Sequence, residues 1–178
     1  MRYPIPTESE ISGLRRDFQE SQAIDDLLNE SVKKTGIAAS DLYAFTKGEQ
    51  GKAQEILAAM QSNTNLQVAY RGMVEEISIY KMPEAIAASS EEFPTRQASG
   101  CQIKVEKSRA EESQYYIIIT VSDMDRIAPD LMTVIDQDNN IERLELPVPR
   151  SGIIQVSTDE KSGIPLMLKN PKTAIYLG

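Results

Sequence analysis

The sequence has 178 residues with 19 basic and 27 acidic side chains, no histidine, no tryptophan and a single cysteine, Cys101. Without an imidazole, the Ser-His-Asp and Cys-His nucleophile systems are excluded, and one cysteine cannot complete a tetrahedral zinc site. The formal net charge of −8 opposes direct binding to a nucleic acid backbone, which favours clustered lysine and arginine. Composition therefore favours a binding protein over an enzyme.

The same composition predicts a globular protein without a membrane segment. The hydrophobic fraction is 40% and the charged fraction is 26%. Residues 1–10 lack the apolar stretch of a secretory signal, and the longest apolar run, residues 115–121, is far shorter than the about 20 residues that span a bilayer. A single cysteine cannot form an internal disulfide, which agrees with a reducing compartment. We expect a cytoplasmic protein with no membrane partner.

Helical signals dominate residues 1–82. Thr7 and Glu10 form a capping-box pattern, and Gly36 follows two lysines where a helix is expected to end. Apolar side chains then recur at the spacing of one helix face. The predicted helices cover residues 7–18, 21–35, 40–48, 52–61 and 65–81.

The hydrophobic period changes in the second half of the chain. Residues 83–99 contain two prolines and many small polar side chains, which predicts a linker. From Gly100 onward, apolar and polar residues alternate as in a strand with one solvated face. Residues 115–121 are apolar on both faces, which predicts a central strand covered on both sides. The expected strands cover residues 101–106, 115–121, 131–135, 141–146, 153–157, 166–168 and 174–177.

These elements predict an α+β fold class. An N-terminal bundle of four to five helices, residues 1–82, is followed by a linker, residues 83–99, and by an all-β sandwich or barrel-like domain, residues 100–178.

Two polar segments begin like ion-binding motifs and then depart from them. Residues 136–140 start as a calcium loop does, but Ile141 stands where glycine is required and Pro147 where a bidentate glutamate is required. Residues 48–52 lack the full spacing of a phosphate-binding loop, and no strand is predicted before them. We interpret the segments as a hairpin turn and a turn between helices. The sequence predicts no catalytic residue, no cofactor and no metal site, although a glycosidase-type carboxylate pair stays open.

Residues 41–77, DLYAFTKGEQGKAQEILAAMQSNTNLQVAYRGMVEEI, resemble the N-terminal domain of anti-sigma factors. The family pattern is a short helix ending in Y/F-x-x-G-E, a second helix and a longer third helix. Leu42, Phe45, Gly48 and Glu49 fall on the first of these elements.

Zinc-binding members of that family join their second and third helices with an H-x-x-x-C-x-x-C ligand set. Ala59, Asn63 and Leu66 stand at those positions here, so the resemblance implies a zinc-free variant.

The resemblance implies a cytosolic transcription regulator that sequesters a sigma factor through its helical half. The expected partner-binding stripe is an apolar face of the longest predicted helix, which would lie in a groove of the partner. It consists of Leu66, Tyr70, Met73 and Ile77. The alternative is a non-catalytic protein-interaction or ligand-binding β-sandwich module, an adaptor or assembly component, in which the helices serve only as a cap.

Overall fold

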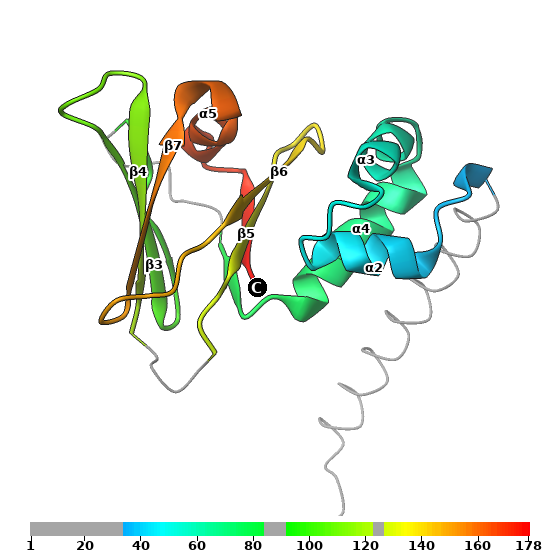
Figure 1. The fold of residues 1–178 in the computed structure, drawn as a ribbon, viewed down its shortest axis with the longest axis horizontal. Coiled ribbons are helices and arrows are strands. Elements are labelled where there is room, and N and C mark those ends of the chain that lie inside the picture. Colours follow the sequence, from blue (N-terminus) through cyan, green and yellow to red (C-terminus); the bar gives the residue numbers. More distant parts are fainter. Residues whose placement is uncertain (1–33, 84–91, 123–126) are drawn as a thin grey trace, which may run out of the picture. The chain divides into compact units, whose positions relative to one another are not determined.

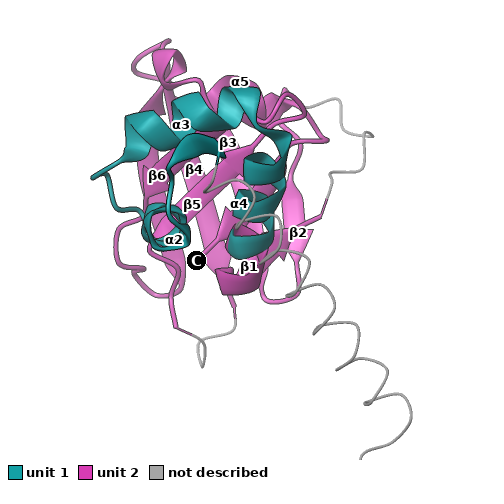
Figure 2. Cartoon of the chain, turned by 90° about the vertical axis from the view of Figure 1, so that its right-hand side faces the viewer, with its two compact units in different colours: residues 1–73 teal, residues 74–178 magenta. Residues whose placement is uncertain are grey.

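The computed structural model describes residues 34–83, 92–122 and 127–178. The chain divides into two compact units, residues 1–73 and 74–178, and each is described by itself (Figure 2). The helix predicted at residues 7–18 and most of the one predicted at 21–35 lie outside the described residues.

Three helices follow one another in residues 34–83: α2 (Ala39–Thr46), α3 (Ala53–Ser62) and α4 (Thr64–Ile77) (Figure 1). α2 begins where a carboxylate oxygen of Asp41 accepts a hydrogen bond from the backbone N–H of Ala38 at 3.2 Å, which satisfies one free donor of the helix start. Its chain reverses at Gly48, whose φ of 92° is readily adopted only without a side chain. The helices predicted at residues 40–48 and 52–61 are thereby confirmed.

The core of the first unit is formed by apolar side chains of all three helices. The rings of Phe45 and Tyr70 lie 5.4 Å apart and tilted by 45°, a favourable arrangement for two aromatic side chains. Leu42, Ile56 and Leu66 are at most 1% exposed. This packing uses the apolar faces of α2, α3 and α4 against one another.

In its described residues, the second unit contains two four-stranded antiparallel sheets. Its elements are β1 (Tyr80–Met82), β2 (Arg96–Ala98), β3 (Cys101–Lys107), β4 (Gln114–Val121), β5 (Leu131–Ile135), β6 (Ile141–Glu145), β7 (Ile153–Asp159), a 3-10 turn (Glu160–Ser162), α5 (Ile164–Lys169) and β8 (Ala174–Leu177). The strand orders are β1-β8-β5-β6 and β2-β3-β4-β7. The final strand predicted at residues 174–177 is an internal strand of the first sheet, paired on both sides.

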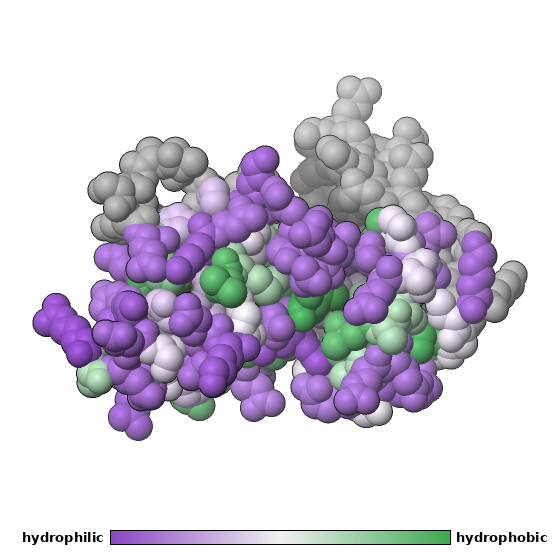
Figure 3. Space-filling model, turned by 90° about the horizontal axis from the view of Figure 1, so that it is seen from above, coloured by the Kyte–Doolittle hydropathy of each residue, from purple (hydrophilic) through white to green (hydrophobic). Residues whose placement is uncertain are grey.

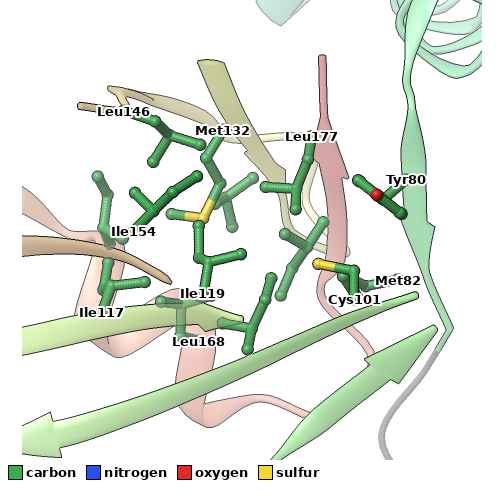
Figure 4. Close-up of a cluster of buried hydrophobic side chains, with 14 of the residues drawn as sticks. Tyr80, Met82, Cys101, Ile117, Ile119, Met132, Leu146, Ile154, Leu168 and Leu177 are labelled. Carbon is green, nitrogen blue, oxygen red and sulfur yellow. The ribbon is translucent and has the colours of Figure 1, made fainter. Parts of the chain in front are cut away.

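Both sheets bury their inner faces in one hydrophobic cluster, so they form a sandwich (Figure 4). Met132 and Leu177 enter it from the first sheet, and Ile119 and Ile154 from the second. α5 lies across one end of the sandwich and adds Ile164 and Leu168 to the same cluster (Figure 1).

The predicted fold class is wrong. Residues 34–83 hold three complete helices rather than a bundle of four to five, and strands organise most of the chain from residue 80 onward. The C-terminal part is also not all-β, because residues 166–168, predicted as a strand, belong to helix α5. Gly163, with φ at 79°, and Pro165 in the first turn set the start of this helix, and Leu166 is exposed instead of alternating inward.

Two short strands occupy places that the sequence assigned differently. The helix predicted to reach residue 81 ends at Ile77, and β1 follows it. Tyr80 and Met82 are buried while Lys81 is exposed. Burial thus alternates from residue to residue, as in a strand, where the spacing of a helix was expected. β2 lies within the segment predicted as a linker.

The buried side chain of Arg96 joins three segments of the second unit. Its Nη1 donates hydrogen bonds to the carbonyl oxygens of Thr173 at 3.1 Å and Pro83 at 3.3 Å. Its Nη2 donates to the carbonyl oxygen of Asn170 at 2.7 Å. Arg96 is 2% exposed, so these bonds form away from water, where charged donors contribute most. We call this set of contacts the Arg96 clamp.

Replacing the clamp should destabilise the protein. Arg96→Met keeps much of the volume but leaves buried carbonyl oxygens without donors, so we expect the free energy of unfolding to fall by roughly 2–4 kcal/mol. Chemical denaturation measures this loss. Arg109→Met, at an exposed position, is the matched control and should change stability little. Equal stability of the two variants would contradict a structural role for the clamp.

Candidate functional site

Strand β3 has an edge that its neighbour covers only in part. β4 pairs with all seven residues of β3, whereas β2 pairs only with Cys101, Gln102 and Ile103. On the β2 side, residues 104–107 therefore have no strand beside them within the described chain. An uncovered strand edge presents free N–H and C=O groups, which is the usual template for adding another strand.

Phe93 and Pro94, which precede β2, direct the chain away from this edge. Continuing the register of Arg96 with Ile103 would place Pro94 opposite Val105, and proline has no N–H to donate to a ladder. Phe93 instead turns into the core, where it is 6% exposed and its ring lies 5.4 Å from that of Tyr115 in an edge-to-face contact.

A groove of about 350 Å³ remains between the departing segment and β3. Its walls are Glu92, Phe93 and Thr95 on one side and Lys104, Val105, Glu106 and Lys107 on the other. Successive residues of a strand point to opposite faces, so a groove lined by four consecutive residues follows the edge of β3 and not one face. We call this site the β3-edge groove.

An ion pair fixes one end of the groove. Nζ of Lys169, at the end of α5, lies 2.7 Å from Oε1 of Glu92 and 5.2 Å from the centre of the Phe93 ring. The hydrogen bond from Lys169 is the main cause that lowers the pKa of Glu92, and Lys107 lowers it further. The same bond raises the pKa of Lys169. Both groups are therefore charged at neutral pH.

The residues predicted to bind a partner are not gathered on an exposed stripe. Leu66 and Tyr70 are fully buried, and Tyr70 packs on Phe45 within the first unit. Met73 and Ile77 are half-buried. The helix thus uses half of the predicted stripe for packing within this chain.

Two of the three positions that the resemblance aligns with zinc ligands have structural roles in this chain. Oδ1 of Asn63 accepts a hydrogen bond from the N–H of Leu66 at 3.2 Å and so caps the start of α4. Leu66 itself is a core residue of the first unit.

The remaining polar features are structural as well. Oδ1 of Asp136 accepts hydrogen bonds from the N–H groups of Asp138 and Asn140 at 2.9 and 2.8 Å, which confirms the predicted hairpin turn. Cys101 is buried in the core cluster, and burial raises the pKa of its thiol to about 11.

Among the residues that the structure describes, no group of three Cys, Asp or Glu side chains is placed to hold a metal ion, and no helix is both long and apolar enough to cross a bilayer.

The exposed apolar side chains of the described residues do not mark a second site. The described residues with large exposed apolar side chains are Tyr43, Val68, Ile127, Val148, Ile153 and Leu166. Seen from above, the surface is mainly hydrophilic with small apolar areas (Figure 3). Scattered exposed apolar residues of this kind are normal on a protein surface.

Comparison of the chain with protein-family models, with curated proteins and with solved structures finds no significant match.

The sequence reasoning missed the β3-edge groove because it treated residues 92–95 as part of a linker. The available signal was Phe93-Pro94 placed directly before a run of period two. An aromatic residue followed by proline next to a strand indicates a buried anchor and an interrupted ladder.

The ion pair at the groove should be visible in the titration of Glu92. We expect the pKa of Glu92 to lie below the usual glutamate value and to return toward it in Lys169→Met, as measured by NMR of the side-chain carboxyl. Because the folded-state pKa is lowered, the pair stabilises the fold above the usual pKa, and this contribution disappears as the pH falls through the lowered value. Lys172→Met is the matched control. An unchanged Glu92 pKa in Lys169→Met would show that the pair does not form in solution.

Proposed function

We propose that this chain is a non-catalytic protein-interaction module that binds an extended segment of a partner protein along the β3-edge groove. The observation that carries the proposal is the edge of residues 104–107, which β2 leaves uncovered and which a groove follows. In this binding mode, main-chain hydrogen bonds supply affinity and neighbouring side chains supply specificity.

The rigidity of the site supports the proposal. β3 is held along its whole length by β4, and Phe93, on the opposite wall, is packed against Tyr115. The Arg96 clamp fixes the chain directly after Thr95. A preformed site loses little conformational entropy on binding, which favours affinity even when the ladder is short.

The charges of the groove set a limit on what binds. Proteins commonly protect open strand edges with charged side chains. Lys104, Glu106 and Lys107 have this effect here, since a strand without matching charges would desolvate them without compensation. The groove therefore fits a selective interaction better than general aggregation through the edge.

Blocking the groove tests the proposal. A capped peptide of alternating threonine and valine should shift the backbone amide signals of residues 104–107 in NMR and slow the hydrogen exchange of those amides that point away from β4. Thr95→Trp places a large ring in the groove and should weaken this binding about tenfold, equivalent to about 1.4 kcal/mol.

Thr120→Trp is the matched control, because Thr120 is an exposed residue of β4 in the same sheet. It should leave the binding unchanged. Peptide signals that appear only elsewhere on the protein, or equal affinity of both variants, would refute strand addition at β3.

A second candidate follows from the order of the helices. α2 ends at Thr46, two residues before Gly48 and Glu49, and α3 and the longer α4 follow, which supports the resemblance to anti-sigma factors. On this proposal the partner is a sigma factor, both proteins are cytoplasmic, and the surface offered is different from the buried Leu66 and Tyr70.

Capture of partners by the full chain tests this candidate. After cross-linking in the source cell at low salt, we expect a sigma factor among the captured proteins. Recovery of neither a sigma factor nor a polymerase subunit, while other proteins are captured, would exclude the candidate.

A further inference from the structure

The open part of β3 carries two charges of opposite sign on one face. Lys104 and Glu106 are two positions apart and both exposed, so they point to the same side of the strand. Val105, between them, is half-buried and packs against the core cluster. In the described chain neither Lys104 nor Glu106 forms an ion pair.

Glu92 and Lys169 compensate one another's charge at the end of the groove. Glu92 is bonded to Lys169 at 2.7 Å, and Lys107 is near enough to lower the pKa of Glu92 as well. A segment entering the groove therefore meets three charges without an ion pair in the described chain, those of Lys104, Glu106 and Lys107, and of these Lys104 and Glu106 share one face of the strand.

The pairing geometry turns this pattern into a sequence requirement. Side chains directly opposite one another on neighbouring strands lie about 4.5–5.5 Å apart at Cβ, so a favourable partner places an acid opposite Lys104 and a base opposite Glu106. The residue between them, opposite Val105, points to the side of Phe93 and should be apolar. All strand pairs in the described residues of this unit are antiparallel, and antiparallel pairing is slightly more stable per residue than parallel pairing.

We infer that the partner segment runs antiparallel to β3 and carries, from its N- to its C-terminal end, a basic residue, an apolar residue and an acidic residue. This inference rests on the proposed function, because it specifies the ligand of the same groove.

Two peptides of identical composition test the inference. Both are capped and alternate threonine with valine, but one has lysine-valine-glutamate at its centre and the other glutamate-valine-lysine. The first should bind about tenfold more tightly, since two opposite-charge pairs replace two like-charge pairs. Affinities come from titration of the amide signals of residues 104–107.

A charge-exchanged protein is the matched variant. Lys104→Glu combined with Glu106→Lys keeps the net charge and should reverse the preference, so that the glutamate-valine-lysine peptide binds the variant more tightly. The amide spectrum of the free variant verifies its fold, and the comparison of the two peptides on the unchanged protein is decisive without it.

The outcomes separate this inference from the proposed function. Equal binding of both peptides at the β3 edge would overturn the charge rule and leave strand addition standing. Tighter binding of the glutamate-valine-lysine peptide to the unchanged protein would overturn the antiparallel order. Absence of any shift at residues 104–107 with either peptide would refute the proposed function and this inference with it.

Discussion

The Arg96 clamp is the interaction on which the architecture of the second unit depends. A single guanidinium, 2% exposed, holds the end of β1 at Pro83, the end of α5 at Asn170 and the start of β8 at Thr173. These segments belong to different parts of the sequence and do not pair with β2 through their backbones. The first sheet is thereby tied to the edge of the second by charge-assisted hydrogen bonds in addition to the apolar core.

The clamp also explains why the groove has defined walls. Arg96 is the first residue of β2, so the clamp also fixes the position at which Thr95 joins the sheet. Asn170, which accepts from Arg96, directly follows Lys169, and Lys169 holds Glu92 at the far end of the groove. With Phe93 buried against Tyr115, the groove wall is anchored from both its ends by residues that serve the fold. The proposed binding site and the fold thus share a few side chains, as expected for a site supported by a packed scaffold.

The sequence predicts those elements whose pattern is long enough to be unambiguous. β5 and β8 occur at the predicted residues, and the hairpin turn at Asp136 follows from its side-chain chemistry. β1 and β2 have three residues each, too few for a period of two to be distinguished from its surroundings. Leu166 to Leu168 form a short apolar run, which fits a strand or a helix equally, and only the backbone of Gly163 decides. The groove could not be predicted in the same way. Whether a strand edge is open depends on which strands pair in the folded chain, and the pattern within one strand does not contain this information.

The segment before β2 is the nearest candidate for pairing with the open edge of β3, and Pro94 interrupts it. Glu92, Phe93 and Thr95 line the groove opposite residues 104–107 without pairing with them, because Pro94 has no N–H to donate and Phe93 is buried in the core. Such a segment acts at a high effective concentration, which a separate partner could not match. Pro94 therefore keeps the β3 edge open. In a chain without this proline, residues 92–95 would extend β2 and pair with residues 104–107 themselves.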